Sequence, residues 1–231
     1  VHWRPHGKGI KVPEVLQKAI DKGAIGVTCA TVDEAEIMVH FGIRDILIAN
    51  QIVGRRKIAR LLELKKHADV KVAVDHPDNV HELDKAARAM SLTLGVVVEI
   101  DTGMHRTGVS PGQPALELSE IVHNTSGLRY LGLMAWEGHV RSIADRVLRE
   151  REILKSVKLL IETAELCRNI GLPVTIVSGG GSGTCHVTAK QAGITEIQTG
   201  GAIYCDMRCQ NWGVITEPSL FVRATVTSRP S

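Results

Sequence analysis

Short apolar runs alternate with helical patterns along almost the whole chain, and this alternation limits the folds that the chain can adopt. Eight runs have the length and β-branched content of buried strands; they are residues 3–6, 26–30, 45–50, 71–75, 96–101, 131–136, 174–178 and 196–199. Seven helical segments lie between them, and the runs are almost continuously apolar, as parallel strands buried on both faces are. The sequence therefore predicts an α/β fold, a (β/α)8 barrel of the TIM type.

A doubly wound open sheet is the alternative, because a count of strands does not show that the sheet closes. That fold binds dinucleotides through a GxGxxG turn after its first strand. The first run is followed by Pro5-His6-Gly7-Lys8 instead. The absence of this turn favours the barrel.

The pattern changes after residue 199. Residues 221–227 carry β-branched side chains with a period of two, as expected of a half-buried antiparallel strand. No partner strand follows, and a lone strand is not stable. We therefore expect residues 1–205 to form the barrel and residues 206–231 to begin an incomplete, β-rich C-terminal domain.

Composition excludes several classes of partner. The 231 residues have a formal net charge of +3 with both signs interspersed, and only two Phe and two Tyr. This pattern indicates no nucleic-acid groove, and no apolar run is long enough to cross a membrane. The five cysteines include no CxxC pair, which is typical of reduced thiols and predicts a cytoplasmic protein.

A glycine-rich stretch, residues 177–184 with the sequence VSGGGSGT, follows the seventh run. Glycines let backbone N–H groups point inward without obstruction by a Cβ, and such a concave array binds anions, most often phosphate. A second glycine turn, Gly200-Gly201-Ala202, follows the eighth run. Barrels hold phosphate after strands seven and eight, so the two turns together predict a phosphate site. The alternative is a pair of ordinary loops.

The end of the first run places Lys8 at the same rim of the barrel. A lysine there loses solvation, which lowers its pKa and makes the neutral amine available for Schiff-base chemistry. A solvated surface lysine is the alternative, and Lys11, one turn further on, fits that description. A Schiff-base lysine opposite a phosphate site indicates pyridoxal phosphate.

Two further runs end in residues suited to this cofactor. Arg106 lies in a glycine-bounded loop after the fifth run, and its guanidinium suits an anionic ring oxygen; the alternative is a loop-bracing pair with Asp101. After the sixth run come Trp136, a wall for the cofactor pocket, and His139, which can move protons near neutral pH. A structural role is the alternative for His139.

Five motifs occur in one order along the chain. They are Pro5-His6-Gly7-Lys8, Asp101-Thr102-Gly103-Met104-His105-Arg106-Thr107-Gly108, Trp136-Glu137-Gly138-His139, Ser178-Gly179-Gly180-Gly181-Ser182-Gly183-Thr184 and Thr225-Val226-Thr227-Ser228-Arg229-Pro230. Together they resemble the D-threonine aldolase/D-serine dehydratase-like family, fold-type III pyridoxal-phosphate enzymes related to the alanine racemases. The resemblance covers essentially the whole chain.

The resemblance implies a role for each motif. Lys8 would form the Schiff base with the cofactor, Arg106 would contact the ring hydroxyl, and the loops at 178–184 and 200–202 would bind the phosphate. The residues expected at that phosphate are Ser178, Gly180, Gly181, Ser182, Gly183, Gly201 and Ala202. Family members act on β-hydroxy-D-amino acids with help from a divalent metal, so the resemblance also implies a small D-amino acid substrate, a metal and a homodimer.

Two departures from the family pattern are visible. The family commonly has a histidine two residues after the lysine, where this chain has Ile10. The family's metal ligands lie in the C-terminal β-domain, beyond the last residue of this chain, so no residue here is assigned to a metal.

The leading hypothesis is retro-aldol cleavage of the D-threonine aldolase type, giving glycine and an aldehyde. Elimination of the D-serine dehydratase type and amino-acid racemisation are the alternatives among enzymes. A barrel that carries pyridoxal phosphate without turnover is the alternative from another class of protein.

Overall fold

The computed structural model describes residues 1–214 and 216–229 of the chain. Its strands are β1 (His2–Trp3), β2 (Val27–Cys29), β3 (Asp45–Gln51), β4 (Asp69–Val74), β5 (Leu94–Glu99), β6 (Leu128–Met134), β7 (Ile176–Gly179) and β8 (Glu196–Ile197). The α-helices are α1 (Pro13–Asp21), α2 (Val32–Phe41), α3 (Arg55–Lys65), α4 (Pro77–Ala89), α5 (Gln113–His123), α6 (Arg146–Asn169), α7 (Cys185–Thr188) and α8 (Met207–Asn211). Three short 3-10 helices are η1 (Gly7–Gly9), η2 (Gly138–Ser142) and η3 (Gly201–Ile203). Every predicted strand overlaps an observed one.

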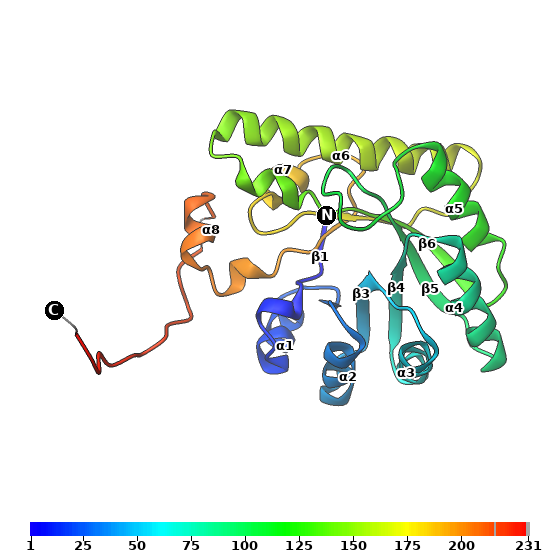
Figure 1. Cartoon of the computed structure of the whole chain (residues 1–231), viewed down its shortest axis with the longest axis horizontal. Helices are drawn as coiled ribbons and strands as arrows, with labels where there is room; N and C mark the ends of the chain where they lie inside the picture. Colours follow the sequence, from blue (N-terminus) through cyan, green and yellow to red (C-terminus); the bar gives the residue numbers. More distant parts are fainter. Residues whose placement is uncertain (215, 230–231) are drawn as a thin grey trace.

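The sheet is parallel and its order is β1-β8-β7-β6-β5-β4-β3-β2. The first strand thus lies beside the last, which an open doubly wound sheet does not allow. The ring closes between β1 and β2, where His6 and Thr28 form a parallel bridge and Pro5 accepts a hydrogen bond from Thr28 N–H at 2.9 Å. The predicted barrel is confirmed, and helices α1 to α6 surround it (Figure 1).

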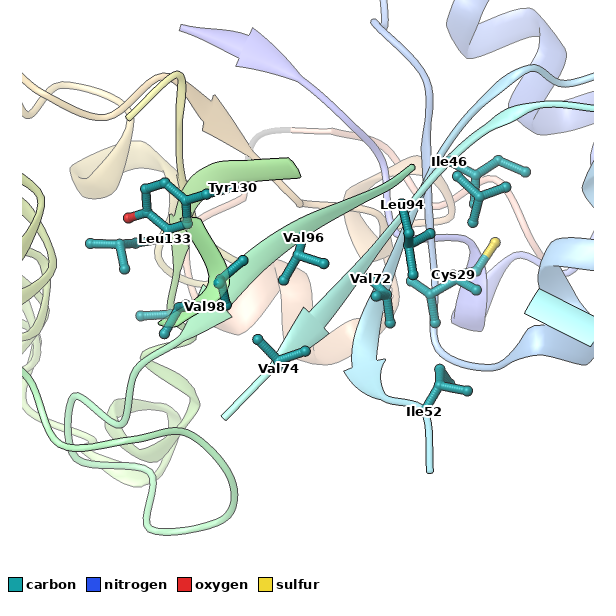
Figure 2. Close-up of a cluster of buried hydrophobic side chains, with 14 of the residues drawn as sticks. Cys29, Ile46, Ile52, Val72, Val74, Leu94, Val96, Val98, Tyr130 and Leu133 are labelled. Atoms are coloured by element: carbon teal, nitrogen blue, oxygen red, sulfur yellow. The ribbon is translucent and has the colours of Figure 1, made fainter. Parts of the chain in front are cut away.

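Side chains along each strand alternate between two apolar clusters. Ile46, Val72 and Val96 point outward into a large cluster shared with the helices (Figure 2). Their neighbours Leu47, Ala73 and Val97 point into the barrel and form a smaller cluster with Leu131, Met134 and Ile176. Both faces of the sheet are therefore buried, which is why each strand is an almost continuous apolar run in the sequence.

The helix that follows β2 shows how local sequence sets its ends. The Thr31 side chain accepts a hydrogen bond from Glu34 N–H at 3.2 Å, as an N-cap does. Gly42 ends the helix in a left-handed conformation, with φ of 107°. Both ends of α2 are therefore set by residues of the local sequence.

An ion-pair network fills the barrel where the strands begin. Arg4 contacts both Asp45, the first residue of β3, and Glu196, the first of β8, the latter at 3.2 Å. Lys71 of β4 joins the network through Asp45 and Asp69, each at 2.8 Å. The side chains of Arg4 and Glu196 are each 3% exposed. This network, the floor of the barrel, lies at the opposite end from the glycine-rich turns.

The segment after the barrel differs from expectation. Beyond α8, residues 216–229 run outward without a strand in their described part, and residues 221–229 are exposed (Figure 1). Residues 221–227 have no neighbouring strand with which to pair, so the period-two pattern does not produce a strand there. A β-rich domain from residue 206 stays a prediction.

Two expectations from composition can be set beside the described residues. None of their helices combines the length and the apolar character that crossing a bilayer requires. All five cysteines are free thiols, four of them buried.

Candidate active site

A cavity of about 250 Å³, the inner cavity, opens where the strands end. It is lined by residues that follow five different strands, among them Lys8, Trp136, Ser182 and Gly201. Arg106, from the loop after β5, also lines it. The amine after β1 and the glycine turns after β7 and β8 thus share one cavity, as the sequence predicts.

Lys8 projects from η1 into this cavity. Its backbone N–H donates to Nδ1 of His6 at 3.4 Å, which fixes the short helix to the end of β1. Removal from water, and then the positive charges of Arg106 and Arg141, lower the pKa of Lys8 below its ordinary value. A lowered pKa increases the fraction of neutral amine, the form that attacks a carbonyl carbon.

Trp136 forms a wall against which three cationic groups lie. Lys8 Nζ is 5.1 Å from the centre of the indole ring, and the guanidinium carbons of Arg106 and Arg141 are 5.0 and 5.8 Å from it. These distances are within the range of cation–π attraction. The ring therefore holds three positive charges around one opening, and these would attract an anionic ligand.

Arg106 does not pair with Asp101, the partner that the loop-bracing alternative requires. The carboxylate of Asp101 accepts the backbone N–H groups of Gly103 and His105, and its partner is the ring of His105 at 3.0 Å. Arg106 lies 3.8 Å from buried Glu99 instead. Pairing of Arg106 with Asp101 was therefore the wrong alternative, and its guanidinium faces the cavity.

Glu137, a residue to which the sequence assigned no separate role, supports the glycine loop from below. It is 2% exposed and accepts hydrogen bonds from Gly180 N–H at 3.3 Å and from the Thr188 hydroxyl at 2.5 Å. Gly180 has a φ of 76°, a left-handed conformation that favours glycine. Gly181 N–H donates to the Thr184 hydroxyl at 2.9 Å.

The Ser182 hydroxyl joins the two glycine turns, which follow β7 and β8. It accepts hydrogen bonds from Ala202 N–H and from the Thr199 hydroxyl, each at 3.0 Å. The amides of Gly180, Gly181 and Ala202 are thus engaged within the protein. Within residues 1–214 and 216–229, the amides of Ser182, Gly183 and Gly201 have no acceptor, and all three residues line the inner cavity.

Three predicted site residues lie outside the lining of this cavity. Ser178 is fully buried, where its hydroxyl donates to Glu196 at 2.9 Å. Ala202 contributes its amide to Ser182. His139 lines a neighbouring, more open cavity of about 520 Å³, the outer cavity. Its Nε2 is 3.5 Å from the Ser156 hydroxyl, and its buried Nδ1 has no partner in the described residues.

Three further residues of the site had no role predicted from the sequence. Arg141 and Trp212 line both cavities, and the Arg141 guanidinium lies 4.8 Å from the Trp212 ring. They come from η2 and the end of α8, and only the folded chain brings them together. His6 also lines the inner cavity, where burial first, and then the charge of Lys8, lower its pKa to about 3 and keep its ring neutral.

Gly200, which follows β8, lies very close to the backbone of His6, which follows β1. A Cβ there would lie 2.1 Å from the carbonyl oxygen of His6, a backbone atom that cannot move aside. We expect Gly200→Ala to lower the free energy of unfolding by about 1–3 kcal/mol, the usual cost of overpacking. Urea unfolding measures this free-energy change. Gly9→Ala is the control, because no atom lies within 4 Å of a Cβ built at Gly9. Equal stability of the two variants would contradict the close approach.

Comparisons with known proteins agree with this architecture. A family model described as the N-terminal domain of alanine racemase matches residues 6–208. The chain is 33% identical to a D-threonine aldolase of Arthrobacter sp. over 100% of this chain and 62% of that protein. It is 31% identical to the D-threo-3-hydroxyaspartate dehydratase of Delftia sp. strain HT23 over 98% of this chain and 60% of that protein.

A solved structure gives the same picture. The crystal structure of D-threonine aldolase from Filomicrobium marinum matches with a TM-score of 0.96 at 34% identity, over 100% of this chain and 64% of that one. The chain therefore spans less than two thirds of the length of each of these relatives. The family resemblance stated from the motifs is confirmed.

Proposed function

The chain belongs to the family of the alanine racemase N-terminal domain, and from this premise we propose that it is the barrel of a pyridoxal-phosphate-dependent lyase. The proposed reaction is retro-aldol cleavage of a β-hydroxy-D-amino acid to glycine and an aldehyde, as the name of the D-threonine aldolase relatives suggests. The observation that carries the proposal is the meeting of Lys8, Arg106 and the Ser182 turn in one cavity.

The chemistry of the donor set fits pyridoxal phosphate. A phosphate group requires several N–H and O–H donors, and the cavity offers the amides of Ser182, Gly183 and Gly201 together with the Ser182 hydroxyl. An aldehyde requires an amine of lowered pKa, which Lys8 supplies. An anionic ring oxygen requires a cation, and Arg106, like Lys8, lies against Trp136 and lines the same cavity.

Each residue would then have a separate task. When bound, pyridoxal phosphate supplies an electron sink that weakens the bonds at the substrate's α-carbon. Lys8 is the covalent attachment point, and Ser182 with its neighbours holds the phosphate. Trp136 excludes water from one side of the cavity. His139, which lines the neighbouring outer cavity, is the residue to which we assign acceptance of the proton of the substrate's β-hydroxyl.

A divalent metal, a homodimer and a cytoplasmic location are part of the proposal because the family resemblance implies them. In residues 1–214 and 216–229, no group of three His, Cys, Asp or Glu could hold a metal ion. The described residues therefore do not fit a metal, and no step is assigned to one. The second domain that we expect from residue 206 would have to supply the ligands.

Elimination is the second candidate, because one relative is a D-threo-3-hydroxyaspartate dehydratase. It would use the same cavity and the same lysine but remove the α-proton and expel hydroxide. Racemisation requires a second base on the opposite face of the substrate. In the alanine racemases that base is a tyrosine from the β-domain of the partner subunit, and of the tyrosines in this chain neither Tyr130 nor Tyr204 lines the inner cavity.

The products decide between these reactions. The protein at its full natural length, with pyridoxal phosphate and with or without Mn²⁺, is incubated separately with D-threonine, D-serine and D-alanine. We expect acetaldehyde and glycine from D-threonine. Pyruvate from D-serine without acetaldehyde would select elimination, L-alanine from D-alanine would select racemisation, and no product from any of them would contradict the enzyme proposal.

A further inference from the structure

Two tryptophan rings lie against the glycine turn that follows β7. A Cβ built at Gly181 would be 2.9 Å from Nε1 of Trp136, and one built at Gly183 would be 2.8 Å from the ring of Trp212. Carbon atoms in contact are about 3.5–4.0 Å apart, so neither position has room for a larger residue. Gly183, unlike Gly180, does not have a left-handed φ. The contact with Trp212, rather than the backbone conformation, therefore requires glycine at residue 183.

Trp212 reaches the glycine turn from a segment that follows the eight strands. It directly follows α8, and its backbone N–H donates to the Arg208 carbonyl at 3.0 Å. The first turn of α8 is capped by Asp206, whose carboxylate accepts Cys209 N–H at 2.8 Å and lies near the opposite charge of Arg208. The indole is thus fixed to a short helix that is capped at its start.

The chain on both sides of α8 is attached to η3, which carries the second glycine turn. Before α8, the chain leaves η3 directly at Tyr204. After α8, the Thr216 hydroxyl donates to the Ala202 carbonyl at 2.9 Å, and Ser219 N–H donates to the Tyr204 carbonyl at 3.0 Å. The Ser219 hydroxyl adds a bond to the Ile203 carbonyl at 2.8 Å. These bonds hold α8 beside the turns that follow β7 and β8.

Arg141 links the two tryptophan rings. Its guanidinium carbon is 4.8 Å from the centre of the Trp212 ring and 5.8 Å from that of Trp136, within the range of cation–π attraction. Arg141 and Trp212 line both the inner and the outer cavity, so they belong to the wall that the two cavities share. This wall therefore joins η2 to the end of α8 next to the glycine turn.

The glycine turn presents unused donors to the inner cavity beside this wall. In the part of the chain that the structure describes, the amides of Ser182 and Gly183 have no acceptor. A hydrogen bond from such an amide to an anion is stronger where water is kept away. The ring of Trp212 lies directly against Gly183 and excludes water from that side of the residue.

We propose that Trp212 is a cofactor-retention residue, whose ring covers the Gly183 amide and thereby slows the release of a phosphate ester from the inner cavity. The identity of that ester as pyridoxal phosphate rests on the proposed function, whereas the contact between Trp212 and Gly183 does not. The phosphate site is then completed by a residue that lies beyond the barrel expected from the sequence, which ends at residue 205.

The first experiment measures how fast the cofactor leaves. The full-length protein, its Trp212→Ala variant and a Met207→Ala control are loaded with pyridoxal phosphate and diluted into excess alkaline phosphatase, which destroys the free cofactor, while the visible absorbance is followed. Met207 belongs to the same helix, is 70% exposed and lines neither cavity. We expect the absorbance to decay roughly tenfold faster in Trp212→Ala, since a charge-assisted hydrogen bond becomes open to water, and at the unaltered rate in Met207→Ala.

Pyridoxal, which lacks the phosphate group, is titrated into the same three proteins as the comparison ligand. Its affinity should hardly change in Trp212→Ala. An equal loss of affinity for pyridoxal and for pyridoxal phosphate would overturn the assignment, because Trp212 would then act on the ring of the ligand. Equal rates of cofactor loss in all three proteins would also overturn it. Failure of the unaltered protein to take up pyridoxal phosphate at all would instead overturn the proposed function.

A double-mutant cycle tests the contact without the cofactor. Gly183→Ala, Trp212→Ala and the double variant of the full-length chain are unfolded in urea. Because the added methyl group meets the indole, Gly183→Ala should lower the urea midpoint in the unaltered chain and have a smaller effect in the Trp212→Ala background. Equal shifts in the two backgrounds would refute the contact, whether or not the cofactor binds.

Gly183→Ala also separates retention from packing. The variant keeps its amide N–H but displaces the indole, so it should speed cofactor loss as Trp212→Ala does, and the double variant should lose the cofactor no faster than Trp212→Ala alone. Coupling in urea without any change in the rate of cofactor loss would show that the contact only stabilises the fold, and would overturn the retention role.

Discussion

Replacement of Lys8 by alanine is expected to abolish both the visible absorbance of the bound cofactor and the lyase activity. Lys8 is the amine that lines the inner cavity together with the Ser182 turn, and its Nζ is 5.1 Å from the centre of the Trp136 ring. Without it the cofactor has no covalent attachment, and loss of a covalent catalyst lowers kcat by on the order of 10⁴-fold or more. The protein is purified, incubated with pyridoxal phosphate and scanned in the visible range before the assay with D-threonine.

Lys11 provides the matched control for this experiment. It lies three residues away, its side chain is 71% exposed, and it pairs with Glu34 at 3.4 Å outside the cavity. Lys11→Ala should keep both the absorbance and the activity. Persistence of the absorbance in Lys8→Ala, or its loss only in Lys11→Ala, would exclude Lys8. Circular dichroism of both variants shows whether they are folded.

Replacement of Arg4 by methionine is expected to lower the free energy of unfolding by about 3–5 kcal/mol, the cost of leaving a buried partner uncompensated. Glu196 is 2% exposed and would keep the hydrogen bond from Ser178 but lose its counter-ion. Burial alone would lower the pKa of Arg4, but Glu196 and Asp45 raise it. The guanidinium is therefore charged in the fold, and its removal breaks a true ion pair.

Urea unfolding measures this loss, and Arg60→Met is the comparison. Arg60 also contacts two carboxylates, Asp33 and Glu36, but on the surface of the molecule. Its loss should matter much less, because exposed ion pairs are screened by water. Glu196→Gln added to Arg4→Met should recover part of the stability by removing the leftover charge. An Arg4→Met protein as stable as Arg60→Met would refute a supporting role for the floor.

The strands and the rim of the site could be read from the sequence because each depends on short-range information. A buried parallel strand is an apolar run whatever its neighbours are, and a glycine turn after a strand carries its phosphate signal within eight residues. The position of Lys8 opposite Ser182 then follows from the barrel rule that strand ends share one rim. These are the parts of the prediction that needed no knowledge of side-chain contacts.

The remaining features depend on contacts between distant residues. Arg141 is placed by two indoles that are 76 positions apart, Trp136 and Trp212, and no spacing in the sequence indicates this pair. Arg106 takes Glu99 rather than Asp101, because Asp101 is engaged by the backbone of its own loop. Ser178 lies within the predicted motif but faces Glu196 in the interior, since alternate residues of a strand point to opposite faces.

The separation of the ion-pair floor from the cavities bears on how such a protein can diverge. Substitutions among the loops that line the two cavities do not touch Arg4, Asp45 or Glu196. Substitutions at the cavity end of the barrel can therefore change the substrate preference, while the ion-pair floor at the other end keeps the barrel stable. Among proteins that diverge in this way, the residues that line the cavities would vary most and the residues of the ion-pair floor would vary least.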